Sequence, residues 1–200
     1  MDDMPNIAIS PRLSGSATEV PDQTSPSSPG IPWAAVGQWS AVNEALAFFT
    51  KSHGQRLGSV FRLAAATDAA LRALHDMTAA LALSSCRFCP APCCDGAAPW
   101  YDLADLLMIH FGGIAIPPGQ PIARYGDGCR FLGPAGCRLP RPQRPWICVW
   151  YTCPVQRAAL SLTPDRHREY ISLTATIKTH RQRMERLFIG ITTGDASSVG

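Results

Sequence analysis

The cysteines are the residues of this chain whose type and spacing could do chemistry. All eight lie between Cys86 and Cys153, and they form three groups. The groups are Cys86, Cys89, Cys93 and Cys94, then Cys129 and Cys137, then Cys148 and Cys153. A chain of 200 residues can bury a core without cross-links. The clustering therefore poses a choice between disulfides and metal ligands.

The start of the chain indicates a compartment in which cysteines more often bind metal than form disulfides. It is acidic, with Asp2 and Asp3, and no apolar run typical of a secretory signal follows. The best candidate for a membrane span, residues 103–117, contains Asp105 and His110, so we expect no membrane span. These features indicate a cytoplasmic protein, and in that reducing compartment clustered thiols more often bind metal than form disulfides.

The cysteine spacing suits thiolate coordination. A C-x-x-C pair such as Cys86 and Cys89 can turn both thiolates onto one ion, and zinc takes four ligands at about 2.3 Å. A reversal at residues 133–136 would bring Cys129 and Cys137 together. Iron–sulfur clusters use the same thiolates. All eight cysteines are therefore predicted ligands of zinc or iron, the iron either as an ion or in an iron–sulfur cluster, and one or two centres fit that number.

In these motifs the chain resembles the YkgJ-type cysteine-cluster proteins, described as a zinc- or iron-chelating domain. That family opens with a CxxCxxCC cluster, and here residues 86–94 match it with one extra residue before the last pair. A C-x-F-L…G-x-C element follows at residues 129–137, and an R-P-x-x-C…C element at residues 144–153. The resemblance implies metal chelation by these cysteines, without a defined reaction.

Two enzymatic alternatives stay open. One is an iron–sulfur oxidoreductase; the other is a protein-modifying enzyme, because the YkgJ-type family looks related to flagellin lysine N-methylases. No paired carboxylates or Ser/His/Asp set is visible, and no glycine-rich loop after a strand suggests a methyl-donor site. The basic residues of segment 156–188 are predicted to form a solvated helix face, which makes nucleic acid an unfavoured partner. No sequence feature indicates a protein partner.

Five arginines lie within a few residues of a cysteine. They are predicted either as solvated loop residues or as donors of hydrogen bonds to the cysteine sulfurs. They are Arg87, Arg130, Arg138, Arg141 and Arg144. The five histidines are scattered, and each is predicted to be exposed or hydrogen-bonded.

The elements expected to position the cysteines are mainly helical, with irregular cysteine-rich loops packed between helices and little or no sheet. We expect a disordered tail over 1–30, a helical segment over 31–85, a metal-binding core over 86–153 and a C-terminal helical segment over 154–194, with 31–194 as one domain. The expected helices are 40–53, 59–83, 103–111 with Asp102 as its cap, 145–151 and 164–188, with a short strand at 113–116.

Overall fold

The structure is a computed structural model that describes residues 30–85 and 97–194. The predicted tail and four of the predicted ligands therefore lie outside the described residues. Those ligands are Cys86, Cys89, Cys93 and Cys94. Within the described part, the predicted mainly α fold is confirmed, with one two-stranded sheet.

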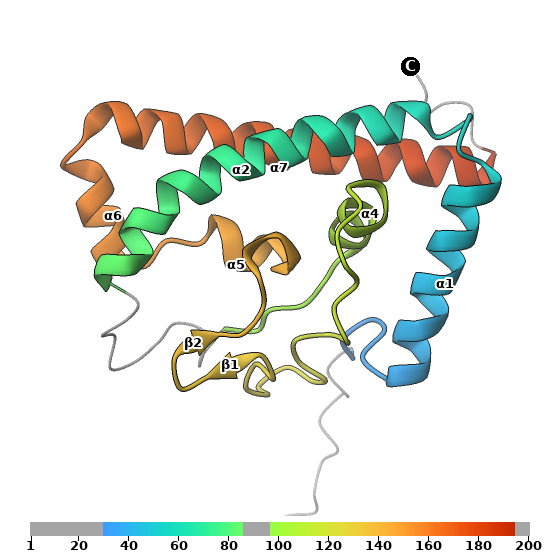
Figure 1. The fold of residues 1–200 in the computed structure, drawn as a ribbon, viewed down its shortest axis with the longest axis horizontal. Coiled ribbons are helices and arrows are strands. Elements are labelled where there is room, and N and C mark those ends of the chain that lie inside the picture. Colours follow the sequence, from blue (N-terminus) through green and yellow to red (C-terminus); the bar gives the residue numbers. More distant parts are fainter. Residues whose placement is uncertain (1–29, 86–96, 195–200) are drawn as a thin grey trace, which may run out of the picture.

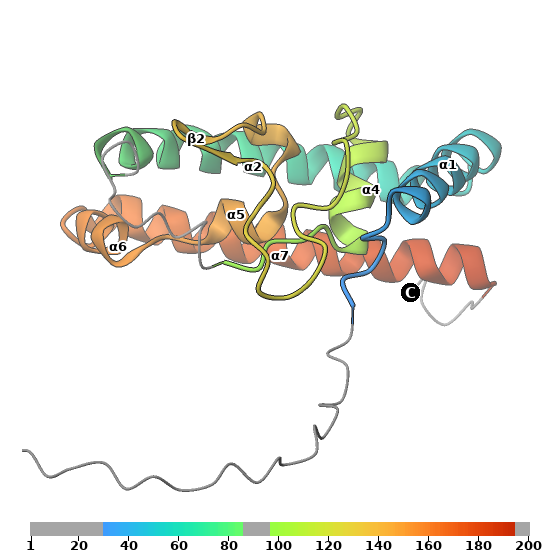
Figure 2. The ribbon, with the colours of Figure 1, turned by 90° about the horizontal axis from the view of Figure 1, so that it is seen from below.

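Two long helices form the frame of the molecule. They are α2 (Gly58–Ser85) and α7 (Pro164–Thr193), which run antiparallel and pack side by side (Figures 1 and 2). α2 is held to α7 by apolar stripes, for example Leu74 of α2 and Ile177 of α7, both fully buried. In Figure 1 the described segment that carries Cys129, Cys137 and Cys148 lies below this pair of helices.

Two shorter helices pack against this frame and complete the main core. α1 (Val36–Ser52) stands at one end, and α4 (Leu103–Phe111) lies under the two long helices (Figure 1). Nearly all of α4 is buried, with Leu106 and Leu107 fully so. A helix whose side chains are buried on nearly every face must be enclosed by its neighbours, so α4 is the central element of the core.

The chain beyond α4 carries the described cysteines on short elements. An antiparallel hairpin, β1 (Leu132–Gly133) and β2 (Gly136–Cys137), is followed by a 3-10 helix η2 (Arg141–Gln143), α5 (Trp146–Trp150) and α6 (Pro154–Ser161). Gly136 has a φ of 100°, which is a conformation that glycine adopts without strain. The predicted reversal between Cys129 and Cys137 is therefore confirmed.

The bounds of the helices test the local sequence signals. α4 begins after Asp102, whose carboxylate accepts the Asp105 N–H at 2.8 Å, and ends at Gly112, both as predicted. α1 begins four residues earlier than expected, because the cap residue is Ala35 and Ser40 is an exposed residue inside the helix. α7 extends past the expected end at residue 188 and stops at Gly194, which has a positive φ.

The short strand predicted over residues 113–116 is wrong. No strand forms there; instead the Ile114 N–H donates to the Ile109 carbonyl and closes the end of α4. The expected helix at 145–151 is present as α5, with Pro145 as its cap. α6 is an additional helix, begun by Pro154 in its first turn, within the segment expected to be helical.

Neither long helix has the apolar composition of a membrane span. α2 and α7 exceed the length that a bilayer span needs, but neither is apolar enough, and no other helix of residues 30–85 and 97–194 qualifies.

Candidate metal centre

Three of the four described cysteines line one pocket. Cys129 precedes the hairpin, Cys137 ends β2 and Cys148 lies in α5, and all three contribute to the wall of a pocket of about 570 Å³. The C-terminal half of α2 also lines this pocket, through His75 and Thr78. The fold thus brings thiols from separate segments to one concave surface.

Tyr101 lies near these cysteines and is itself buried. Burial raises the pKa of its hydroxyl, and the negative charges of Asp105 and then of the Cys148, Cys137 and Cys129 thiolates raise it further. The hydroxyl donates to the Gln143 carbonyl at 2.6 Å, so it has a fixed position.

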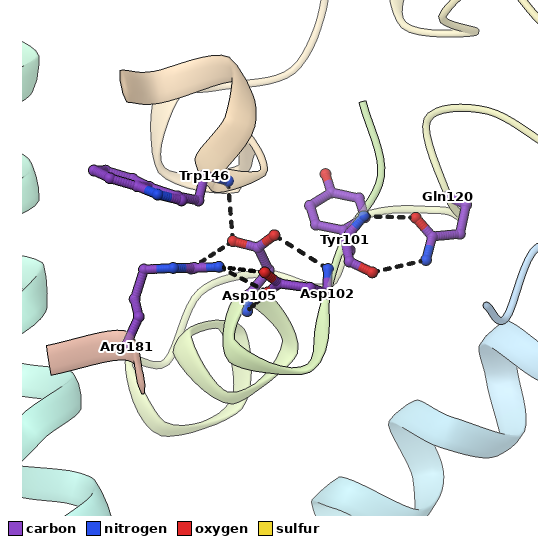
Figure 3. A network of polar contacts seen from close by, with 6 residues as sticks. All are labelled: Tyr101, Asp102, Asp105, Gln120, Trp146 and Arg181. Carbon is purple, nitrogen blue, oxygen red and sulfur yellow. Dashed lines mark hydrogen bonds and ion pairs between the residues drawn. The ribbon is translucent and has the colours of Figure 1, made fainter. Parts of the chain in front are cut away.

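The backbone of Tyr101 is held by a buried amide. The Oε1 atom of Gln120 accepts the Tyr101 N–H at 2.7 Å, and its Nε2 donates to the Tyr101 carbonyl at 3.0 Å (Figure 3). The same Nε2 donates to the Pro32 carbonyl at 2.9 Å. Gln120 is fully buried, so these bonds satisfy an amide that would otherwise be costly to enclose.

A buried ion-pair network fixes α5, the helix that carries Cys148. Arg181 of α7 donates from Nη1 to Asp105 Oδ1 at 2.6 Å and from Nη2 to Asp102 Oδ1 at 2.7 Å (Figure 3). Asp105 Oδ1 also accepts the N–H of Trp146, the first residue of α5, at 3.0 Å. The Arg181 guanidinium carbon lies 5.7 Å from the Trp146 ring centroid, which suits a cation–π contact.

The protonation of this network follows from its burial. Burial raises the pKa of Asp105 to about 6, although the Arg181 guanidinium acts in the opposite direction. Burial also disfavours the charge on Arg181, but Asp105 and Asp102 outweigh it and raise the pKa of the guanidinium. Near pH 7 the pair is therefore ionised, which matches a carboxylate that accepts hydrogen bonds from both Arg181 and Trp146.

The predicted ligands are not equally placed. Cys153 is half-buried at the start of α6 and is not among the described residues that line the pocket. Among the described residues, no three His, Cys, Asp or Glu side chains are grouped closely enough to hold a metal ion. A zinc ion would require its thiolates about 3.8 Å from one another, from tetrahedral geometry with Zn–S bonds of about 2.3 Å.

The arginines near the cysteines separate into two pairs. Arg141 and Arg144 are half-buried and line the pocket together with the thiols. Arg130 and Arg138 are exposed, and the Arg138 guanidinium donates to the Arg130 carbonyl. Arg87 lies outside the described residues. Proximity to a cysteine in the sequence therefore does not predict which of the described arginines line the pocket.

The prediction that every histidine is exposed or hydrogen-bonded fails at one ring nitrogen in three half-buried histidines. His53, His75 and His180 each bury a ring nitrogen that has no hydrogen-bond partner in the described part of the chain. Of these, His75 lines the thiol pocket, through a position that sequence reasoning missed. Its place four residues after Leu71, on the apolar stripe of α2, was the available signal.

The chain matches no protein-family model, no curated protein and no solved structure. What the pocket can bind is therefore inferred from its own residues.

Proposed function

We propose that this protein binds zinc or iron through cysteine thiolates. The pocket lined by Cys129, Cys137 and Cys148 is proposed to form part of the metal centre. The observation that carries the proposal is the convergence of Cys129, Cys137 and Cys148 on one pocket. Cys129, Cys137 and Cys153 are thiols and not disulfides, so they are available as ligands. The spacing of the cysteine motifs, which resembles that of YkgJ-type proteins, supports the same function.

The remaining ligands are proposed to come from the segment between α2 and Ala97. Ala97 lines the pocket, and α2 lines it through Thr78 about two turns before ending at Ser85. Ala97, the first described residue after the intervening segment, therefore belongs to the wall that holds the three thiols. Its cysteines complete the proposed ligand set with Cys153, and they are Cys86, Cys89, Cys93 and Cys94.

The thiolates suit zinc and iron–sulfur clusters alike, because both are held by cysteine sulfur. Any reaction, whether redox chemistry or protein modification, would depend on which of these is bound. A reducing compartment such as the cytoplasm is proposed as the place of action, because it keeps thiols free for metal.

The test is metal analysis of the full-length protein purified without oxygen. We expect zinc or iron at one or more equivalents per chain, and loss of that metal in the C129S/C137S/C148S variant and after treatment of the wild type with a chelator. Circular dichroism of the variant and of the chelated wild type checks that the helical frame persists. Near-absence of both zinc and iron from the wild type overturns the proposal.

An absorption spectrum of the same sample assigns the metal. Colourless protein with bound zinc indicates a chelating or structural centre. Brown protein that contains acid-labile sulfide and is bleached by dithionite indicates an iron–sulfur cluster.

A further inference from the structure

The thiol pocket has an uneven charge. Its described lining includes the two arginines Arg141 and Arg144 but no Asp or Glu side chain. The third basic residue, His75, contributes little positive charge near pH 7, because burial, reinforced by the two arginines, lowers its pKa. The fixed positive charge of the described lining therefore comes from two guanidinium groups, and the same lining holds three thiols.

Both guanidinium groups are positioned by hydrogen bonds. Arg141 Nη1 donates to the His75 carbonyl at 3.0 Å and to Thr78 Oγ1 at 2.9 Å, which joins η2 to α2. Arg144 Nε donates to the Leu139 carbonyl at 3.1 Å. The Arg144 Nη atoms make no hydrogen bond within the described residues, so they remain able to donate to an occupant of the pocket.

A thiolate–metal centre is an anion. Zinc with four thiolates carries a charge of about −2, and so does a doubly positive four-iron cluster with four thiolates. Enclosing such a charge in a partly apolar pocket is costly unless cations or hydrogen-bond donors compensate it. Outer partners of this kind typically change metal affinity by about 10- to 100-fold.

We propose that Arg141 and Arg144 are positioning residues that compensate the negative charge of the thiolate centre and so strengthen its hold on the metal. The inference rests on the proposed function. Arg130 and Arg138 also lie next to cysteines in the sequence, but they are exposed and are not among the described residues that line the pocket. The inference therefore gives them no role in metal binding. These two exposed arginines are the matched controls.

The experiment measures the zinc affinity of the full-length metal-free protein, without oxygen, by competition with a chelating dye. We expect R144Q to bind zinc about 10-fold more weakly than the wild type, or weaker still, and R144K to recover most of the loss because it keeps the charge. R130Q and R138Q should match the wild type. The R141Q and R141K pair repeats the comparison, with circular dichroism as a check because Arg141 also contacts α2.

A purely structural role predicts a different pattern. It would lower the thermal stability of metal-free R144Q and leave R144K as impaired as R144Q. Charge compensation predicts unchanged stability of the metal-free variants and an affinity that follows the charge. If the wild type binds zinc and R144Q binds it equally well, or if Lys gives no rescue, this inference is wrong while the proposed function stands. If the wild type binds neither zinc nor iron, both are wrong.

Discussion

Arg181 on α7 and Asp105 on α4 form an ion pair of 2.6 Å between Nη1 and Oδ1, although 76 residues separate them. Their side chains are only 7% and 8% exposed. Because the same Asp105 oxygen accepts the N–H of Trp146, the pair joins the helical frame to the first residue of α5 (Figure 3). The frame thereby sets the position of Cys148, two residues further along.

Substitution of Arg181 tests this coupling. R181M leaves the Asp105 and Asp102 carboxylates without their cation, and breaking a buried pair in this way costs about 3–5 kcal/mol. We expect the free energy of unfolding in urea to fall by that amount. R183M removes an exposed arginine from the same helix and should change it by less than about 0.5 kcal/mol. Equal effects of the two substitutions would show that the buried network does not stabilise the fold.

His110 gives a pH dependence with a defined sign. Its Nε2 lies 2.9 Å from Asn43 Oδ1, and burial lowers its pKa below the usual 6.5. The unfolded chain then binds the proton more readily than the folded chain, so this contribution to stability is present above about pH 6.5 and is lost as the pH falls from there through the lowered pKa of the folded chain. His75, whose pKa is also lowered, likewise makes the protein less stable as the pH falls. Asp105, whose pKa is raised, makes the protein more stable as the pH falls.

The contribution of His110 is therefore measured as a difference between two proteins. H110Q cannot titrate, so its free energy of unfolding relative to that of the wild type should improve as the pH falls from about 7.5 to about 5.5. Urea unfolding at several pH values gives this difference. A difference that stays constant over the range would contradict the assignment.

Local signals made some elements predictable. The bounds of α4 follow from Asp102 before an apolar run and from Gly112 after it. The hairpin between Cys129 and Cys137 follows from Gly133 and Gly136, because a tight reversal is decided by the residues within it. These predictions needed no knowledge of distant contacts.

The polar contacts between distant helices were not predictable in the same way. The sequence predicts Arg181 to lie on a solvated basic face of the helix, but it is buried. Its place on the apolar stripe, between Ile177 and Met184, was a sign that it faces inward, but nothing local names Asp105 as its partner. The convergence of α5 on α2 likewise depends on tertiary packing, which decides which cysteines and arginines share a pocket.

The two cysteines of the third group should differ in effect. Cys148 lines the pocket, whereas Cys153 is not among its described lining residues. Loss of a residue that only supports a ligand typically weakens metal binding by about 10- to 100-fold. We expect C148S, which removes a proposed ligand, to weaken zinc binding by at least that much, and C153S to weaken it less. Dye competition measures both affinities. A larger loss in C153S would place the centre at α6 instead of the pocket.

Mapping of cysteine reactivity tests most directly whether the thiols hold metal. Full-length protein purified without oxygen is alkylated before and after treatment with a chelator, and the rate at each cysteine is read by mass spectrometry. Thiolates bound to metal react slowly, so Cys129, Cys137 and Cys148 should be slow before chelation and fast after it. Rates at these three cysteines that chelation leaves unchanged would contradict the account.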